Sequence, residues 1–184
     1  MTVEPDLERV FPRLETIEDD ELRAGVRAAW TSAIEDNGVE SLESVPWFPP
    51  VQRDLDLPEE TLVAHVHDVT AGATALAESL GERREADIDL DVLLAGALVH
   101  DVSKLYEFDG MAETAVQRLL GHPHYGVHVV THAGLPTEVA HIVLSHTSRT
   151  AVEPATIEAE IVRRADEVAA AAIRGEAVSD RREA

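Results

Sequence analysis

The sequence contains no cysteine, and this absence excludes disulfide bonds, thiolate metal ligands and thiol nucleophiles together. Aromatic residues make up only 4% of the 184 residues, so the 45% that are hydrophobic are largely alanine, leucine and valine. A core of this composition favours helices over sheets. The length suits one domain that is large enough to bury a substantial core.

Long hydrophobic runs are also missing. No stretch approaches the roughly 20 consecutive apolar residues that a membrane-spanning helix needs, and the polar N-terminus does not resemble a signal peptide. The sequence also lacks the GxxxxGKS or GxxxxGKT, GxSxG and GxGxxG patterns of common nucleotide-binding and hydrolase sites. We therefore expect a cytoplasmic protein with no membrane partner and with none of these sites.

Basic residues are scarce, since 15 lysines and arginines stand against 36 acidic residues and the net charge is -21. Such a composition is typical of proteins from microbes that accumulate salt, where charge repulsion is screened beyond about 3 Å at about 1 M salt. An ordinary acidic protein is the alternative. The negative charge argues against a nucleic-acid partner.

Hydrophobic periodicity predicts helices along the whole chain, with no second domain or internal repeat. Glycines at positions 81, 134 and 175 are the expected stop signals of three of these helices. The proline-rich segment 46–58 is expected to be a loop whose Trp47 and Phe48 pack back onto the body. The expected helices span residues 17–34, 59–80, 90–102, 122–132, 136–145 and 157–173.

The pair His100-Asp101 lies at the end of an apolar segment, residues 93–99, and is followed by Lys104. A buried histidine beside a buried aspartate is costly unless the two are compensated, and a metal ion compensates them well. Lys104 is the only lysine of the chain. We therefore favour a role in substrate binding over the alternative, a cation that complements the dipole of the preceding helix.

Further polar residues share helix faces with apolar residues. Helical phase places His65, His146 and Asp166 on the apolar stripes of their expected helices, where a polar residue is informative. Each one alone is better explained as a buried residue with ordinary hydrogen bonds or as a helix end. Because they occur together with His100 and Asp101 on four different helices, they predict a metal site on an all-helical scaffold.

His124, His128 and His132 recur at intervals of four residues and therefore lie on one helix face. This spacing alone nominates His128 and His132 as a ligand pair, but no acidic residue lies between them as in an HExxH motif. We interpret the three as a polar face. His122, at the start of the same helix, is the better inward-facing candidate.

The order of these residues resembles the HD-domain superfamily of metal-dependent phosphohydrolases, over about residues 65–166. His100-Asp101 matches the doublet that defines the family. Six positions in order are far more specific than this doublet, because His-Asp pairs are common. The matching positions are His65 in HVHDV, His100-Asp101, His122 in HPHYG, His146 in LSHT and Asp166 in RRAD.

The resemblance implies an all-α, HD-domain-like helical bundle of five core helices with an N-terminal helical extension. The expected organisation is a helix and proline-rich loop over 1–58 that pack on the core, a metal-binding domain over 59–174, and a frayed tail over 175–184. The sequence departs from the family pattern at Ser103, where glycine is frequent, and at Thr147, where a second histidine is frequent. The second departure argues against branches of the family whose site uses that extra histidine.

The resemblance also implies one or two divalent transition-metal ions. By this analogy one ion is bound by His65, His100, Asp101 and Asp166, and Asp101 bridges to a second ion bound by His122 and His146. Mixed imidazole and carboxylate ligands suit manganese, iron, cobalt, nickel or zinc, and argue against calcium. Two ions about 3.5–4 Å apart can share a hydroxide and clamp a phosphoryl group.

The expected activity is hydrolysis of a small phosphate monoester or diester, nucleotides included, by metal-activated hydroxide. Asp101 and Lys104 are the expected catalytic residues, and Lys104 and Arg149 are the expected phosphate contacts. For Arg149 an exposed loop residue without function is the alternative.

Two other functions stay open. The first is a di-iron oxygenase, because some HD-fold oxygenases resemble this chain in the same six ligands in the same order. The second is a non-catalytic regulatory module, which predicts degraded ligands, whereas all six are present. The sequence does not predict the substrate, the native metal or the oligomeric state.

Overall fold

The computed structural model describes residues 6–55, 60–110 and 112–183. Within these ranges the chain forms nine α-helices, three short 3-10 helices and one small sheet of two strands. The expected all-α class and helical bundle are therefore confirmed. None of the helices in the described ranges combines the length and the apolar character needed to cross a membrane.

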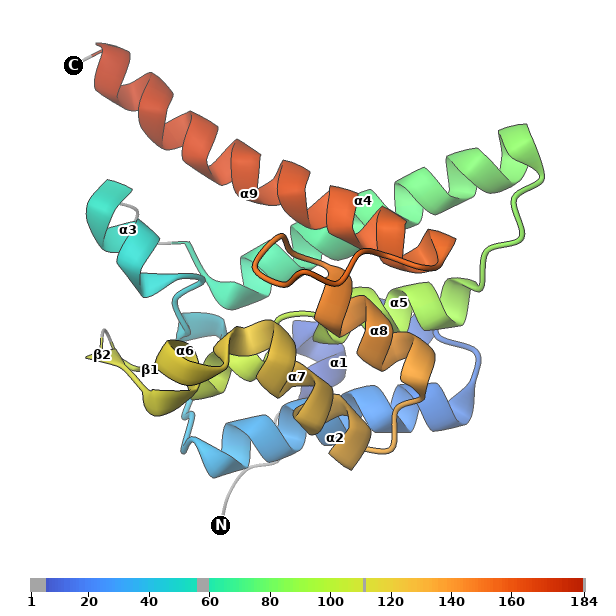
Figure 1. The fold of residues 1–184 in the computed structure, drawn as a ribbon, viewed down its shortest axis with the longest axis horizontal. Helices are drawn as coiled ribbons and strands as arrows, with labels where there is room; N and C mark the ends of the chain where they lie inside the picture. Colours follow the sequence, from blue (N-terminus) through green and yellow to red (C-terminus); the bar gives the residue numbers. More distant parts are fainter. Residues whose placement is uncertain (1–5, 56–59, 111, 184) are drawn as a thin grey trace.

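Helix α5 (Leu90–Val99) is the central helix of the bundle. Asp89 caps its start by accepting a backbone hydrogen bond, and every residue over 93–99 is buried. Because the second half of α5 has no exposed side, the residues that directly follow it, His100 and Asp101, also lie in the interior. The helices around it in Figure 1 are α2 (Asp20–Asp36), α4 (Leu62–Arg84), α8 (Thr137–Ser145) and α9 (Ile157–Glu183).

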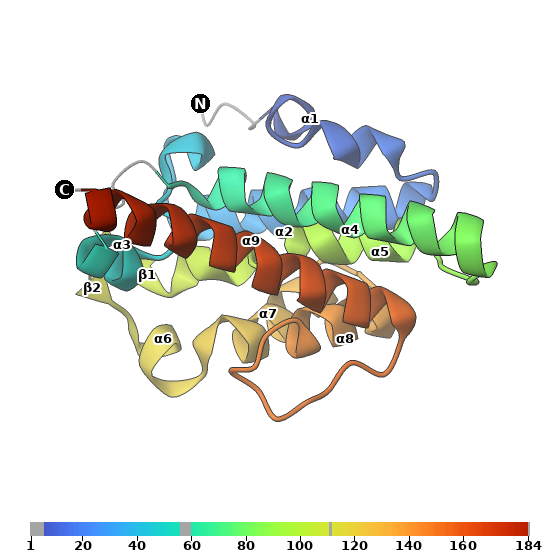
Figure 2. The same ribbon diagram turned by 90° about the horizontal axis from the view of Figure 1, so that it is seen from above.

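Helices α4 and α9 pack against each other, with α9 lying across α4 (Figures 1 and 2). The Thr61 side chain caps the start of α4. The expected end at Gly81 is wrong, because the helix continues for three more residues to Arg84. It ends where Glu85 adopts a left-handed conformation with φ of 53°. The expected start at residue 59 lies outside the described residues.

Helix α9 also continues past its expected end. It passes through Gly175, the expected stop, and ends at Glu183. A single glycine inside a helix costs only about 1 kcal/mol relative to alanine, and no proline follows it. The division of the chain at residues 58 and 174 stays a prediction, and the first of these boundaries lies outside the described residues.

Helices α7 (Gly121–His132) and α8 form a hairpin on the opposite side of the molecule from α1 (Figure 2). Gly134, with φ of 84°, makes the turn between them as expected.

The expected extension of α5 to residue 102 is wrong, because the chain leaves the α-helix after Val99 and continues as a 3-10 helix, η3 (Val102–Tyr106). The elements that were not predicted here are β1 (Phe108–Asp109), β2 (Ala112–Glu113) and α6 (Ala115–Leu119).

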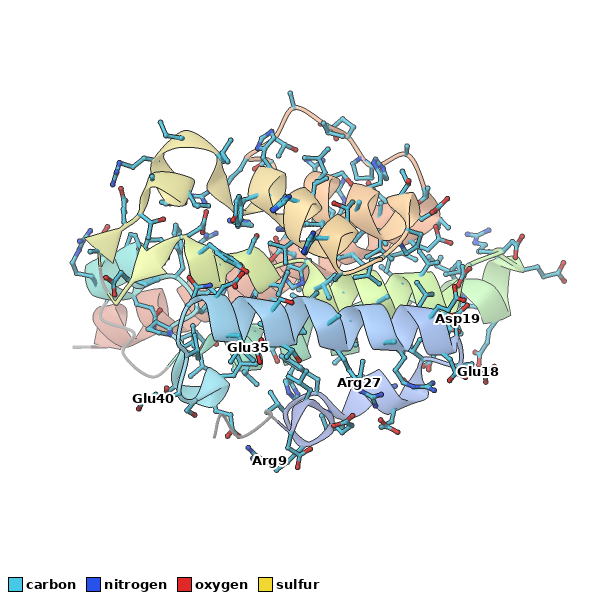
Figure 3. The ribbon with its side chains drawn as sticks, turned by 90° about the horizontal axis from the view of Figure 1, so that it is seen from below. Arg9, Glu18, Asp19, Arg27, Glu35 and Glu40 are labelled. Atoms are coloured by element: carbon cyan, nitrogen blue, oxygen red, sulfur yellow. The ribbon has the colours of Figure 1, made fainter. Side chains whose placement is uncertain are left out.

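The N-terminal segment covers one face of the bundle, where α2 runs along the surface (Figure 3). Trp30 of α2 is fully buried, and its indole N–H donates to the carbonyl of Leu98 in α5 at 3.0 Å. On the outer side, Arg27 forms an ion pair with Glu8 at 2.5 Å. The hydrogen bond of Trp30 ties α2 to the end of α5, and the ion pair ties α2 to the N-terminal segment before it. Two short elements that were not expected precede α2, namely α1 (Leu7–Val10) and η1 (Pro12–Thr16).

The proline-rich segment is not a loop throughout. After η2 (Leu42–Ser44), a seven-residue helix, α3 (Pro49–Leu55), begins with two prolines. Proline is tolerated in the first turn of a helix, where a backbone N–H has no acceptor in any case. As expected, Trp47 is buried and Phe48 is partly buried, and both pack against α9. The last part of the expected loop, residues 56–58, lies outside the described residues.

Gly96 allows α5 and α8 to approach closely, because a Cβ atom there would lie 2.5 Å from Cδ1 and 2.8 Å from Cγ2 of Ile142. We expect Gly96→Ala to lower the free energy of unfolding by about 1–3 kcal/mol through overpacking. Gly81→Ala is the matched control, because no described atom lies within 4 Å of the Cβ position at Gly81. Alanine there is expected to stabilise α4 by about 1 kcal/mol or less. Urea denaturation measures both effects, and equal stability of the two variants would contradict the packing.

Candidate metal centre

Six side chains from five separate segments of the chain meet where α5 ends. Five of them are almost fully buried, and Asp166 has a side chain that is 17% exposed. The structure therefore brings together all the residues for which the sequence predicted metal binding. They are His65 of α4, His100 and Asp101 directly after α5, His122 of α7, His146 directly after α8, and Asp166 of α9.

Four of these residues form a first group of donors. Nε2 of His65 lies 3.0 Å from Oδ1 of Asp166 and 3.4 Å from Nε2 of His100. Nε2 of each of these histidines also lies 3.4 Å from Oδ2 of Asp101. One ligand atom from each of the four lies within 4.8 Å of the others. Two imidazole nitrogens and two carboxylate oxygens around one point are a donor set for a divalent transition metal.

Asp101, His122 and His146 form a second group, whose ligand atoms again lie within 4.8 Å of one another. Oδ1 of Asp101 lies 3.4 Å from Nε2 of His122 and 3.7 Å from Nε2 of His146. Asp101 thus presents Oδ2 to the first group and Oδ1 to the second. A carboxylate in this arrangement can bridge two ions.

Two of the histidines are oriented by backbone carbonyls at the ends of their helices. Nδ1 of His100 donates to the carbonyl of Ala97, and Nδ1 of His146 donates to the carbonyl of Val143, both at 2.7 Å. A carbonyl only accepts, so Nδ1 carries the proton in both rings. Nε2 is then left with the lone pair that a metal ligand needs.

Glu107 orients a third histidine, and the sequence did not identify it. Its buried carboxylate accepts a hydrogen bond from the backbone N–H of His122 at 2.6 Å and lies 3.3 Å from Nδ1 of the same residue. A carboxylate behind a metal-binding histidine fixes the ring and raises its basicity. The signal was weak, because a glutamate three residues after Lys104 is ordinary in an acid-rich chain.

The two departures from the family pattern both lie close to this centre. The hydroxyl of Ser103 donates to the carbonyl of His122 at 2.7 Å, so it ties η3 to the start of α7. Thr147 lines the cavity described below. The residues that the structure does not bring to the centre are His124, His128 and His132, which lie exposed on α7 as the polar-face interpretation predicted.

The carboxylate of Asp101 is ionised although it is buried. Burial raises its pKa, but the interactions with Lys104, first of all, and with His100 and His122 outweigh burial and hold the pKa of Asp101 well below its usual range. Nζ of Lys104 lies 2.7 Å from Oδ2. Both oxygens are buried and accept no hydrogen bond of regular geometry from the described residues, so Lys104 compensates Oδ2 as an ion pair. Because a buried charged oxygen without a partner is costly, the donor set fits a bound cation.

Two of the histidines and Asp166 are also in the form that binds a metal, whereas the charge and hydrogen bond of Asp101 outweigh burial and raise the pKa of His100. Burial lowers the pKa of His122 to about 4 and also lowers that of His65. For Asp166, burial acts upward, but the hydrogen bond from His65 and the neighbouring histidines bring the pKa down to about 2. Neutral imidazoles and ionised carboxylates are the metal-binding forms, so His65, His122 and Asp166 need no change of protonation at neutral pH.

A cavity of about 390 Å³ opens onto the centre. Asp101, His122 and His146 contribute to its wall, and so do both predicted phosphate contacts. Lys104 is 8% exposed, whereas Arg149 is exposed to solvent. The remaining lining residues are Trp47, Phe48, Thr147, Ser148, Asp166, Glu167, Ala170 and Arg174.

Comparison with known proteins agrees with this arrangement. Residues 62–171 match the family model described as HD domain, and this range contains all six residues of the centre. The dihydroneopterin 2',3'-cyclic phosphate phosphodiesterase of Methanocaldococcus jannaschii is 31% identical to the chain over 175 residues. That alignment covers 88% of this chain and 68% of the relative. No solved structure gives a significant match.

The two donor groups predict the effect of losing one histidine. We expect the manganese-loaded protein to hold two ions per chain and His146→Ala to hold about one, because only the second group loses a ligand. His128→Ala removes an exposed histidine of α7 and is expected to keep both ions. Elemental analysis after gel filtration gives the stoichiometry. Two ions in His146→Ala would contradict the division into two groups.

Glu107 offers a test of how the second group is oriented. We expect Glu107→Gln to weaken binding of one ion by about 10–100-fold, because the ring of His122 loses its anionic partner. Affinity at the first group is expected to stay unchanged. Glu138→Gln, on the exposed side of α8, is the control. Competition with a fluorescent chelator measures both affinities, and equal weakening at both groups would argue for a general structural defect instead.

Proposed function

The chain belongs to the HD-domain family, and on this premise we propose that it is a phosphodiesterase that hydrolyses a cyclic phosphate ester of a small molecule. Its broader class, a metal-dependent phosphohydrolase, follows from the family match and from the related phosphodiesterase. The observation that carries the proposal is Asp101, one carboxylate shared by two groups of donors beside a cavity lined with cations.

We assign the metal ligands as the two donor groups suggest. The first ion is assigned to His65, His100, Asp101 and Asp166, and the second to Asp101, His122 and His146. Mixed nitrogen and oxygen donors suit manganese, iron, cobalt, nickel or zinc. Ions bound there would supply an activated hydroxide at neutral pH and would polarise the phosphoryl oxygens.

Lys104 is placed to stabilise negative charge on the phosphoryl group. Its ammonium group is held 2.7 Å from Oδ2 of Asp101 and lines the cavity. Negative charge develops on the non-bridging phosphoryl oxygens in the transition state. These oxygens can accept a hydrogen bond from Lys104 without reorganisation of the site. Because the ammonium is largely buried, this interaction is stronger than it would be in water.

Arg149 is the second proposed phosphate contact. It lies on the loop after α8, three residues beyond His146, and it lines the same cavity as Lys104. A guanidinium group binds two oxygens of a phosphate in a fixed plane, which a lysine cannot do. Lys104 and Arg149 together are proposed to hold the phosphate while the metal ligands keep their positions.

A small cyclic diester suits the size and charge of the cavity. Its volume of about 390 Å³ lies in the range of about 300–1,000 Å³ that is usual for small-molecule sites. The related enzyme acts, by its name, on a 2',3'-cyclic phosphate, and we propose the same class of substrate bond for this chain.

In the proposed reaction the oxygen of water bonds to phosphorus, one ring P–O bond breaks, and the released oxygen takes a proton. The product is a phosphate monoester.

The two alternative functions have less support. A regulatory module predicts lost ligands, whereas all six side chains are present and close together. A di-iron oxygenase would use the same six ligands, but no feature of the described residues favours it, and the related enzyme is a phosphodiesterase. A cytoplasmic location stays a prediction.

We expect the protein loaded with manganese or iron to hydrolyse 2',3'-cyclic AMP and bis(p-nitrophenyl) phosphate. Lys104→Met, which keeps the side-chain length, is expected to lower kcat by about 100–1,000-fold, because the charge developing on the phosphoryl group loses its donor. Arg118→Met, at an exposed position outside this cavity, is the control. Product release measured by chromatography checks the prediction. Oxygen uptake without cleavage of any phosphodiester would favour the oxygenase.

A further inference from the structure

The lysine and arginine side chains that line the cavity all lie over one of two neighbouring aromatic rings. Nζ of Lys104 lies 5.1 Å from the ring centre of Trp47 and 5.6 Å from that of Phe48. The guanidinium carbon of Arg149 lies 5.0 Å from the ring centre of Phe48, and that of Arg174 lies 5.9 Å from Trp47. Both rings lie outside residues 62–171, the range that matches the family.

The segment that carries the two rings is fixed by hydrogen bonds. Oε1 of Gln52 accepts from the backbone N–H of Phe48 at 2.9 Å, and Nε2 of Gln52 donates to the carbonyl of Glu60 at 2.7 Å. The backbone N–H of Trp47 donates to the same carbonyl at 3.1 Å. The ring of Trp47 also lies 5.0 Å from that of His65. The positions of both rings are thus set relative to the metal centre.

Arg149 has no carboxylate partner among the residues that the structure describes, although 36 acidic residues are present in the chain. Its guanidinium group lies over the ring of Phe48 instead. Such a contact uses the face of the guanidinium and leaves the N–H groups in its plane free, whereas a carboxylate would occupy them. Lys104 differs, because Asp101 already holds it at 2.7 Å.

We propose that Phe48 is a positioning residue that holds Arg149 with its N–H groups directed at a phosphoryl oxygen of the substrate. This inference rests on the proposed phosphodiesterase function and names the recognition element for its phosphate. The contact exists before and during the reaction, so losing it weakens binding of substrate and of the transition state alike. The effect therefore falls on KM and leaves kcat unchanged.

A direct contact between Phe48 and a planar base of the substrate is the competing role. The two roles make different demands. Positioning requires Arg149 and does not depend on what is attached to the phosphate. Stacking on the substrate requires a planar ring in the substrate and does not depend on Arg149. Substrates with and without a base, tested with and without Arg149, therefore separate them.

The experiment compares four single variants and one double variant of the metal-loaded full chain. Phe48→Leu removes the aromatic face, and Phe48→Tyr keeps it. Phe108→Leu is the matched control, because this ring contacts Phe48 at 6.0 Å but does not line the cavity. Arg149→Ala, alone and combined with Phe48→Leu, completes a double-mutant cycle. The readouts are KM and kcat for 2',3'-cyclic AMP and for glycerol 1,2-cyclic phosphate, and the Kd of inorganic phosphate by calorimetry.

We expect Phe48→Leu to raise KM for both substrates, and the Kd of phosphate, by about 3–10-fold, as for loss of a cation–π contact. The value of kcat is expected to stay within about 2-fold, and Phe48→Tyr and Phe108→Leu are expected to behave like the wild type. In the Arg149→Ala background, Phe48→Leu is expected to have no further effect.

Additive effects of Phe48→Leu and Arg149→Ala would overturn the proposal, and so would an effect confined to 2',3'-cyclic AMP. Unchanged KM and phosphate affinity in Phe48→Leu would overturn it as well. If the wild type cleaves neither substrate, the proposed function fails. The phosphate-binding measurement still tests the pair of Phe48 and Arg149 in that case, because it does not require turnover.

Discussion

A single buried carboxylate, that of Asp101, is the constraint on which the rest of the site depends. It lies in the interior because α5 is buried on every side along its second half. An ionised carboxylate is costly there unless positive charge surrounds it. Lys104 forms an ion pair with Oδ2, whereas Oδ1 has no lysine or arginine beside it among the described residues and faces His122 and His146. The site is therefore built to receive cations, which the phosphohydrolase chemistry of the family requires.

The ends of helices supply much of the precision of this site. His100 and His146 each directly follow a helix, and each donates from Nδ1 to a carbonyl three residues earlier. Carbonyls at a helix end have no partner within the helix, so the same bond satisfies the carbonyl and orients the ring. Glu107 does the equivalent for His122. A rigid arrangement of donors thus comes from ordinary backbone geometry.

The sequence was sufficient to predict the features that depend on local patterns. The phase of His65 and Asp166 on apolar stripes, the order of the six residues and the all-α class needed only helical periodicity and a family pattern. Glu107 could not be predicted, because its importance arises only where η3 meets α7. Similarly, the contact of Phe48 with Arg149 joins segments about a hundred residues apart. Helix α3 was missed because two prolines were interpreted as a break instead of a start.

The central claim is that Asp101 joins two metal sites through its two oxygens. Electron paramagnetic resonance of the manganese-loaded protein tests this most directly, since two ions about 3.5–4 Å apart and bridged by a carboxylate are magnetically coupled. At full loading we predict a coupled multiline spectrum that is replaced by an isolated six-line signal in Asp101→Asn. An isolated six-line signal from the fully loaded wild type would contradict the shared carboxylate and the account built on it.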